Sequence, residues 1–116
     1  METPRGNELD HPIGYPVRHT ETGEYFNIYG PEYEIIEDLK LAGIYEHYKS
    51  TLENPKFYEV DYVVRSSDNG ECFVIYHPLY ESDDTTVPAR PIDNFTDNAE
   101  VDREEVPRFR LIRFNR

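Results

Sequence analysis

Residues 64–78 read VRSSDNGECFVIYHP and predict a β-hairpin. Apolar residues alternate on both sides of the dipeptide Asn69-Gly70, which supplies the positive φ angles that tight hairpin turns need. We expect one strand to end near Arg65 and its partner to run over residues 72–77. This hairpin forms the centre of the predicted sheet.

A second copy of the pattern stands earlier in the chain, where residues 17–31 read VRHTETGEYFNIYGP. When residues 14–33 are aligned with residues 61–80, an offset of 47, ten of the twenty positions are identical. Chance would give about one or two matches, so we interpret the two stretches as an internal repeat. Gly23 stands where the second copy has Gly70, which predicts the same turn in both.

The differences between the copies predict which face of each hairpin is buried. Phe73 and Ile75 recur as Phe26 and Ile28, whereas the valine between the first pair becomes Asn27. Side chains alternate across a strand, so the Phe and Ile side chains should share a core face and the opposite face should be wetter. We therefore predict that Phe26 and Ile28 are buried, like Phe73 and Ile75.

The rest of the chain predicts one short helix and several strands. A proline, an acidic first turn and a narrow apolar stripe predict a helix over Pro31–Leu41, ended by Gly43. Further strands are expected over residues 44–49, 58–64, 73–76, 87–95 and 108–114. Two prolines confine the strand in residues 87–95 to an edge or a bulge. The predicted fold class is mainly β, a five-stranded small barrel or strongly bent sheet from about residue 43.

The chain divides into two parts that together form one compact domain. Residues 1–42 hold a polar arm, the first hairpin and the short helix, and residues 43–116 hold the barrel. The first copy of the pattern lacks counterparts of the last strands, so it cannot close a barrel alone. Its strands therefore either extend the sheet of the barrel or pair with a second molecule.

Six short segments occur in an order that is typical of one bacterial family. They are residues 45–49 (YEHYK), 58–60 (YEV), 64–71 (VRSSDNGE), 74–80 (VIYHPLY), 90–95 (RPIDNF) and 106–109 (VPRF). Over about residues 43–114 the chain resembles the bacterial domain-of-unknown-function family 1653. The resemblance implies a small SH3-like barrel and implies no particular activity.

Composition limits the classes of partner. Asp and Glu number 24 against 12 Lys and Arg, which gives a formal net charge of −12. This charge disfavours nucleic acid and membrane surfaces as partners and favours a basic protein. The single cysteine, Cys72, excludes an internal disulfide, and no apolar run is long enough to span a bilayer. The N-terminus also lacks the pattern of a secretory signal, so we expect a cytoplasmic protein.

Tyrosine, arginine and histidine supply the candidate binding surface, because tyrosine gives a large contact area at low entropic cost. The leading hypothesis is a non-enzymatic module that binds a protein, a peptide or a small-molecule ligand. A second copy of the chain, in a homodimer, is a further candidate partner. The expected binding residues are Tyr45, His47, Tyr48, Arg65, Tyr76, His77, Tyr80 and Arg90. We predict no catalytic residue, no metal site and no cofactor for this module.

Two other function classes stay open. His47 and His77, with Glu59 or Asp61, are the candidate groups for a small enzyme that moves a proton, or for a metal site. The expected hairpin register places His77 opposite Tyr62, and the four histidines lack a recognised metal-ligand spacing. The third hypothesis is an acidic inhibitor that occupies a basic site on another protein.

Overall fold

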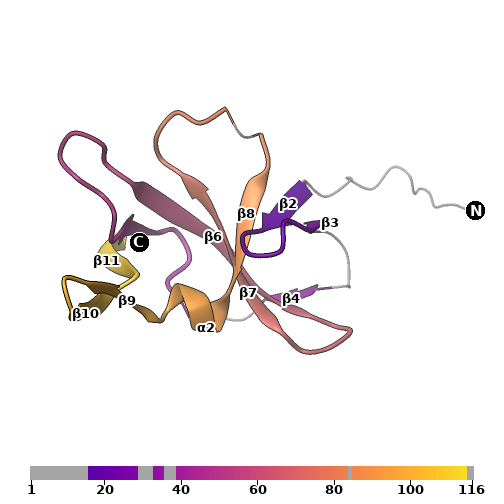
Figure 1. The fold of residues 1–116 in the computed structure, drawn as a ribbon. Coiled ribbons are helices and arrows are strands. Elements are labelled where there is room, and N and C mark those ends of the chain that lie inside the picture. The colour runs from indigo at the N-terminus through magenta and orange to yellow at the C-terminus, as the bar shows by residue number, and fades with distance from the viewer. Residues whose placement is uncertain (1–15, 29–32, 36–38, 84, 115–116) are drawn as a thin grey trace, which may run out of the picture.

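The computed structural model describes residues 16–28, 33–35, 39–83 and 85–114, which form a mainly β protein (Figure 1). The elements in chain order are β2 (Pro16–His19), β3 (Tyr25–Asn27), β4 (Tyr33–Ile35), β5 (Gly43–His47), β6 (Phe57–Ser66), β7 (Cys72–Pro78), β8 (Val87–Pro91), α2 (Ile92–Phe95), β9 (Asn98–Val101), β10 (Glu104–Pro107) and β11 (Phe109–Phe114). Eight strands form one sheet in the order β11-β5-β6-β7-β8-β2-β3, with β4 also paired to β6. β9 and β10 form a separate two-stranded hairpin. Within these residues, no helix is long and apolar enough to cross a membrane.

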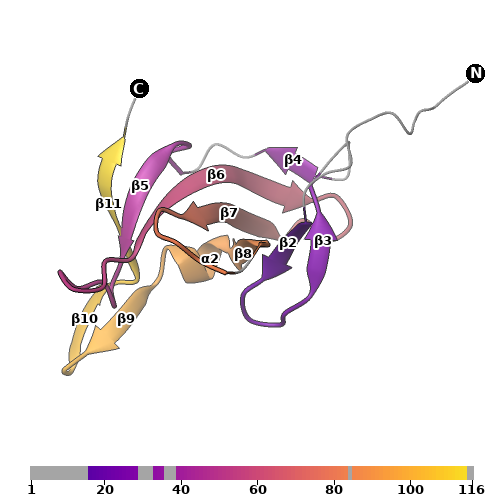
Figure 2. The ribbon, with the colours of Figure 1, turned by 90° about the horizontal axis from the view of Figure 1, so that it is seen from above.

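The large sheet is strongly bent. Figure 2 shows β11, β5 and β6 along one side of the molecule, α2 and β8 along the other, and β2 and β3 together at the far end. The bend encloses a core that contains side chains from β5, β6 and β7 together with Phe95 of α2 and Phe109 of β11.

The predicted central hairpin is present. β6 and β7 pair antiparallel, and Gly70 has a positive φ of 78° at the turn. The Ser66 N–H donates to the Glu71 carbonyl oxygen at 2.9 Å, and the Gly70 N–H donates to the Ser66 carbonyl oxygen at 2.8 Å. Glycine is favoured here because it has no Cβ to oppose a positive φ.

The N-terminal hairpin makes the same turn with the residues that stand 47 positions earlier. The His19 N–H donates to the Glu24 carbonyl oxygen at 2.8 Å, and the Gly23 N–H donates to the His19 carbonyl oxygen at 2.9 Å. Gly23 has a φ of 79°, against 78° at Gly70. The shared glycine therefore serves the same backbone purpose in both hairpins.

β2 attaches the N-terminal hairpin to the rest of the sheet. It pairs in parallel with β8, with Val17 opposite Val87 and His19 opposite Ala89. The Thr20 N–H adds a hydrogen bond to the Ala89 carbonyl oxygen at 2.8 Å. The hairpin thus extends the sheet of its own chain, which is one of the two arrangements that the sequence left open.

The central strands are buried on both faces, which corrects the expectation of one wetter face. Val74 is fully buried and Tyr76 is 2% exposed, because α2 and β11 cover that face. On the opposite face, Phe73 and Ile75 are buried as predicted. The N-terminal hairpin covers this second face through Val17.

Full burial of Phe26 and Ile28 was also expected, and this prediction is wrong in degree. Both side chains pack against the second core, yet each stays partly exposed. The reason is their position, because β3 is the last strand of the sheet and has no outer neighbour among the described residues. The contact itself is present, since the Phe26 ring meets the Phe73 ring edge-on at 5.7 Å between centroids.

The predicted helix over residues 31–41 is wrong. Tyr33–Ile35 form strand β4, and residues 41 and 42 form a turn that precedes β5; residues 31, 32 and 36–38 lie outside the described ranges. β6 has ten residues, and β5 pairs with only its first part, so β4 pairs with the free edge at Val64–Ser66. An aromatic and β-branched segment beside an unpaired strand edge favours pairing over a short, marginal helix.

The described chain has more strands from residue 43 onward than the five expected. The additional hairpin is β9–β10, whose turn residues Asp102 and Arg103 have positive φ values of 53° and 68°. Such two-residue turns normally carry Asn-Gly or Asp-Gly, so the usual sequence signal was missing. The prolines of β8 predicted a strand at an edge or with a bulge, and β8 lies inside the sheet, between β7 and β2. Its last expected residues form α2 instead.

Candidate functional site

Rings from five elements meet on the inner face of the bent sheet. We call Tyr45, His47, Tyr58, Tyr76, Phe95 and Phe109 the aromatic cluster. Phe95 and Phe109 stack with 4.1 Å between ring centroids, and the other contacts are edge-on, such as Tyr76 to Phe109 at 5.6 Å. Alternation along each strand selects these members, because side chains two residues apart on a strand share a face. Polar atoms lie at the edge of the cluster.

Three tyrosine hydroxyls and one guanidinium form that polar edge. The Tyr58 and Tyr80 hydroxyl oxygens lie 2.6 Å apart in a hydrogen bond. Arg90 Nε donates to the Tyr76 hydroxyl at 3.1 Å, and Arg90 Nη1 donates to Asn94 Oδ1. The Arg90 guanidinium also lies over the Phe109 ring, 5.3 Å from its centroid. Arg90 therefore supports the Tyr76 hydroxyl from within the protein.

Burial is the largest influence on the pKa values of the Tyr58 and Tyr76 hydroxyls at this edge. Desolvation raises the pKa of Tyr76, and the nearby charges of Arg90 and Arg18 offset part of that effect. Desolvation and the hydrogen bond to Tyr80 also raise the pKa of Tyr58. At neutral pH both hydroxyls keep their protons and can act as hydrogen-bond donors.

A cavity of about 170 Å³ opens beside these hydroxyls, and we call it the tyrosine cavity. Strand register explains its position: Arg18 of β2 lies opposite Pro88 of β8, and both share a face with Tyr76 of β7. Among the residues that the structure describes, the cavity is lined by Arg18, Thr20, Tyr58, Tyr76, Pro78, Tyr80, Ser82, Thr86 and Pro88. Six of these nine residues carry hydroxyl groups, and none carries a carboxylate.

Thr20 gives the tyrosine cavity an unusual polar group. The Thr20 Oγ1 atom is buried and has no hydrogen-bond partner in the part of the chain that the structure describes. A buried hydroxyl without a partner costs about 1–3 kcal/mol in desolvation. Its backbone is nevertheless fixed, because the Thr20 N–H bonds to β8. A polar group held in this way is suited to a ligand that brings the missing partner.

Six of the eight residues predicted as binding residues belong to or contact the aromatic cluster. They are Tyr45, His47, Tyr48, Tyr76, Tyr80 and Arg90. Tyr45 and Tyr76 are only 7% and 2% exposed, so their rings are core rather than surface. Arg65 is exposed at the far end of β6, opposite Cys72, and lies outside the cavity lining.

His77 lies on the other face of the sheet. A β-bulge between Val60 and Tyr62 shifts the register, so His77 stands opposite Glu59 and not opposite Tyr62 as predicted. His77 Nδ1 hydrogen-bonds to Asp61, with 2.9 and 3.0 Å to the two carboxylate oxygens. His77 and Asp61 also line a separate cavity of about 420 Å³.

His47 is not part of the His77 group. Its ring contacts Tyr58 and Phe109, at 6.4 and 4.9 Å between centroids, on the face opposite to His77. Burial, followed by nearby positive charges, lowers the pKa of His47 to about 4. A joint site of the two histidines is therefore ruled out by the topology. Among the described residues, no group of three or more His, Cys, Asp or Glu side chains is placed to hold a metal ion.

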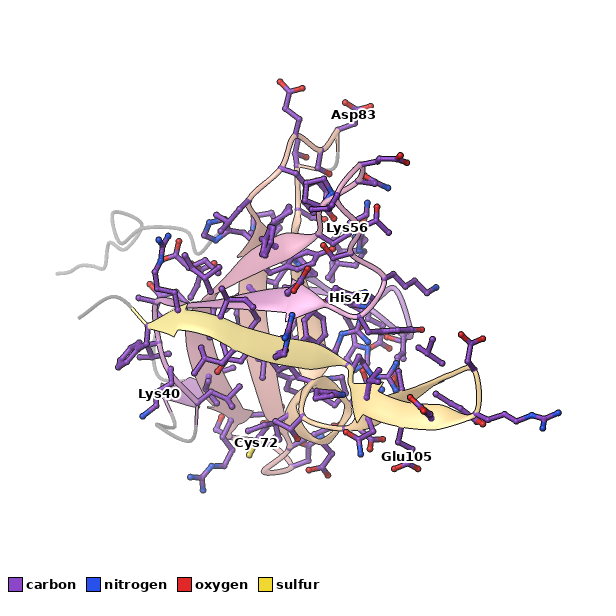
Figure 3. The ribbon with its side chains drawn as sticks, turned by 90° about the vertical axis from the view of Figure 1, so that its left-hand side faces the viewer. Lys40, His47, Lys56, Cys72, Asp83 and Glu105 are labelled. Atoms are coloured by element: carbon purple, nitrogen blue, oxygen red, sulfur yellow. The ribbon has the colours of Figure 1, made fainter. Side chains whose placement is uncertain are left out.

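Cys72 is remote from the tyrosine cavity. Figure 3 shows Cys72 and Asp83 at opposite ends of the sheet, and Asp83 lies in the loop that supplies Ser82 to the cavity. The Cys72 Sγ atom makes a weak contact to the Gly70 carbonyl oxygen at 3.8 Å. The thiol therefore takes no part in this site.

A larger cavity of about 480 Å³ lies between the two hairpin turns. It is lined partly by Glu21, Glu24 and Glu71, and it is built from groups that the turns already use. His19 Nδ1, for example, accepts hydrogen bonds from the N–H groups of Glu21 and Thr22. Size alone does not make this cavity the better candidate, because the side chains of Thr22, Ser66 and Asn69 likewise accept hydrogen bonds within the turns.

Sequence reasoning missed Arg18, Thr20 and Tyr58. Arg18 was paired with Arg65 as a charge that flanks a hairpin turn, and that interpretation ignored its neighbours across the sheet. The parallel pairing of β2 with β8 places Arg18 and Thr20 at the cavity. For Tyr58 a signal was present, since the alternation of β6 already grouped it with Val60.

Fold and site together define a small protein with a bent sheet and a hydroxyl-lined cavity at one end of an aromatic core. The chain matches the model of the family described as "Protein of unknown function (DUF1653)" over residues 43–111, and it belongs to that family. No curated protein and no solved structure matches the chain. The matched range contains β5 to β8 but not β2, so Arg18 and Thr20 come from outside it.

Proposed function

We propose that this protein is a non-enzymatic module that binds a small molecule in the tyrosine cavity. The observation that carries the proposal is the buried, unpartnered hydroxyl of Thr20 beside the hydroxyls of Tyr58 and Tyr76. Proteins normally satisfy buried polar groups, and an exception calls for a functional reason. A bound ligand that hydrogen-bonds to Thr20 supplies that reason.

A small ligand suits the site better than a peptide. The rings of Tyr45 and Tyr76 are buried, so they offer no flat aromatic surface on which a peptide could lie. The tyrosine cavity measures about 170 Å³, and an engineered cavity of about 150 Å³ in another protein binds benzene. The ligand therefore has roughly the size of one substituted ring. We also propose that the protein is cytoplasmic and does not bind nucleic acid. The first point follows from the single cysteine and the second from the net charge of −12.

The variant Thr20→Val tests the proposal, because valine keeps the shape of threonine and removes the hydroxyl. In the ligand-free protein we expect Thr20→Val to raise the free energy of unfolding by about 1 kcal/mol, since a buried unpartnered group is lost. The same variant should weaken ligand binding. Thr85→Val is the control, because Thr85 is an exposed residue that does not line the cavity.

Binding is measured by titrating a library of small fragments into the ¹⁵N-labelled full chain and recording amide chemical shifts. We expect saturable shifts at residues that line the tyrosine cavity, reduced in Thr20→Val and unchanged in Thr85→Val. If no fragment shifts these residues, or if Thr20→Val destabilises the protein, the Thr20 hydroxyl has a structural role and the proposal is wrong.

A second candidate function rests on the contact between His77 and Asp61. Glu59 lies on the same face, with 3.8 Å between Glu59 Oε1 and His77 Nε2, so one imidazole stands between two carboxylates. Burial raises the pKa of Asp61, an effect that the hydrogen bond to His77 partly offsets. An imidazole held between two carboxylates can move a proton, as a small enzyme would require. Fragments that change the amide chemical shifts of His77 and Tyr62, and not those of the tyrosine cavity, would favour this enzyme hypothesis.

A further inference from the structure

The tyrosine cavity offers several hydrogen-bond donors. The Tyr76 hydroxyl already accepts from Arg90 Nε, so its own proton is available to donate elsewhere. In the pair Tyr58–Tyr80, one hydroxyl donates to the other, which leaves the proton of the accepting hydroxyl for a further bond. The Thr20 hydroxyl adds another donor.

Arg18 is the one charged side chain among the described residues that line the cavity. Its guanidinium carries five N–H donors and no acceptor. Arg90 donates a hydrogen bond to the Tyr76 hydroxyl and adds a positive charge next to the cavity lining. Glu81 and Asp83, which lie in the loop before β8, are exposed and are not among the described residues that line the cavity. Within the part of the chain that the structure describes, the cavity lining thus combines a guanidinium with several hydroxyl groups, in a chain of net charge −12.

From these observations we infer that the tyrosine cavity binds a small anion, a carboxylate or a phosphate-type group, with Arg18 as its ionic partner and the Thr20 and Tyr76 hydroxyls as donors. The inference rests on the proposed function and adds the chemical class of the ligand. Because burial raises the pKa of Tyr76, its hydroxyl stays protonated at neutral pH, as a donor to an anion requires.

The N-terminal hairpin is then part of the binding site. Arg18 and Thr20 reach the cavity only because β2 pairs with β8, and the remaining lining residues lie in β6, β7, β8 and the loop between β7 and β8. A ligand that contacts both parts binds the docked state alone, so it stabilises the attachment of the hairpin by mass action. Anion binding and hairpin docking are therefore coupled.

The test uses matched charged and neutral probes with the full chain. Benzoate and benzamide have nearly the same shape and differ in charge, while inorganic phosphate and sulfate test whether a ring is needed. Dissociation constants are obtained from amide chemical shifts at constant ionic strength. We expect benzoate or phosphate to shift the residues that line the tyrosine cavity, and benzamide to bind at least about tenfold more weakly than benzoate, because charge-assisted hydrogen bonds are the stronger ones.

Arg18→Gln and Arg65→Gln form a matched pair of variants, since the two arginines hold equivalent positions in the two hairpins. Arg65 lies outside the cavity lining. We expect Arg18→Gln to weaken anion binding at least about tenfold and Arg65→Gln to leave it unchanged. The thermal unfolding midpoint of each variant shows whether the hairpin still docks.

The outcomes separate the two proposals. If benzamide binds as tightly as benzoate, or if Arg18→Gln binds anions normally, the anion inference is overturned while small-molecule binding stands. If benzoate, phosphate and sulfate all fail to shift the cavity residues, the anion inference is also overturned. In that case the Thr20→Val comparison with neutral fragments decides the proposed function independently.

Discussion

At the scale of single residues, Tyr76 connects the core to the tyrosine cavity. Its ring packs between Tyr58 and Phe95, and its hydroxyl accepts the Arg90 Nε hydrogen bond. In Tyr76→Phe the ring contacts survive, but Arg90 loses an acceptor in a partly buried place. We expect the free energy of unfolding to fall by about 1–2 kcal/mol, measured by urea denaturation.

Tyr25→Phe serves as the control for this change, because Tyr25 is 61% exposed and its hydroxyl can bond to water. We expect that control to alter stability by less than about 0.5 kcal/mol. Equal effects of the two substitutions would mean that the bond from Arg90 to Tyr76 contributes nothing to stability, contrary to the geometry.

His47 makes stability depend on pH in a defined window. Burial in the aromatic cluster lowers the pKa of His47 to about 4, with Arg90 and Lys49 adding to the effect. In the unfolded chain the pKa returns to about 6.5, so between these values the unfolded state binds more protons. Stability is therefore complete above about pH 6.5 and falls as the pH drops toward 4, by about 2 kcal/mol for this partly exposed group.

The variant His47→Gln isolates this contribution. The pKa of Glu46 is lowered as well, chiefly by its hydrogen bond to Arg110, so the carboxylate also loses stability in acid. This loss is present in the wild type and in His47→Gln, and it cancels in their difference. We expect a flatter pH dependence in the variant between pH 4 and 6.5, measured by urea denaturation at several pH values. Parallel curves would show that His47 titrates normally.

At the scale of elements, the two hairpin turns allow a matched comparison. Gly23 and Gly70 have φ values of 79° and 78° and make the same hydrogen bonds. A Cβ added at either position meets nothing within 4 Å, so only the backbone opposes it. We expect Gly23→Ala and Gly70→Ala each to cost about 1–2 kcal/mol, because L-residues disfavour positive φ.

Asparagine tolerates positive φ better than alanine, so Gly23→Asn and Gly70→Asn should cost clearly less than the alanine variants. The free energies of unfolding of all four variants check the expectation. If the two alanine variants differ by more than about 1 kcal/mol, the turns are not energetically equivalent despite their shared geometry.

The sequence predicted those elements whose cause is local. Asn69-Gly70 and its counterpart Thr22-Gly23 defined both turns, and alternation defined the core face of β7. The failures depend on neighbours distant in the chain. β4 forms because β6 offers a free edge, and β8 lies inside the sheet because β2 pairs with it. No local pattern carries that information.

The residues of the candidate site were likewise predicted only where the cause is local. Arg90 and Tyr80 were predicted as binding residues because the chain is rich in tyrosine and arginine, and both contact the aromatic cluster beside the cavity. Arg18 and Thr20 were not predicted, because a parallel pairing between residues about 70 positions apart brings them there. The predicted position of His77 was wrong because a β-bulge in β6 shifts the pairing register of β6 with β7. The turn sequence does not predict that bulge.

At the scale of the whole molecule, the N-terminal hairpin completes a core as well as a cavity. Val64, Phe73, Ile75 and Ala89 are buried against Val17 of β2. A truncated chain that starts at Gly43 loses this cover and exposes the apolar face of β7 and β8. At about 25 cal/mol for each Å² of apolar surface, and about 1.5–3 kcal/mol for each large side chain, we expect a loss of at least about 3 kcal/mol.

Differential scanning calorimetry of the full chain and the truncated chain measures this loss as a lower unfolding midpoint. Val17→Ala in the full chain tests the same contact without changing chain length, and it should cost about 2 kcal/mol because Val17 is fully buried. Val101→Ala is its control, since Val101 is 39% exposed. If the truncated chain melts at the full-length temperature, the hairpin is an appendage, and Arg18 and Thr20 then belong to a cavity that the protein does not need for folding.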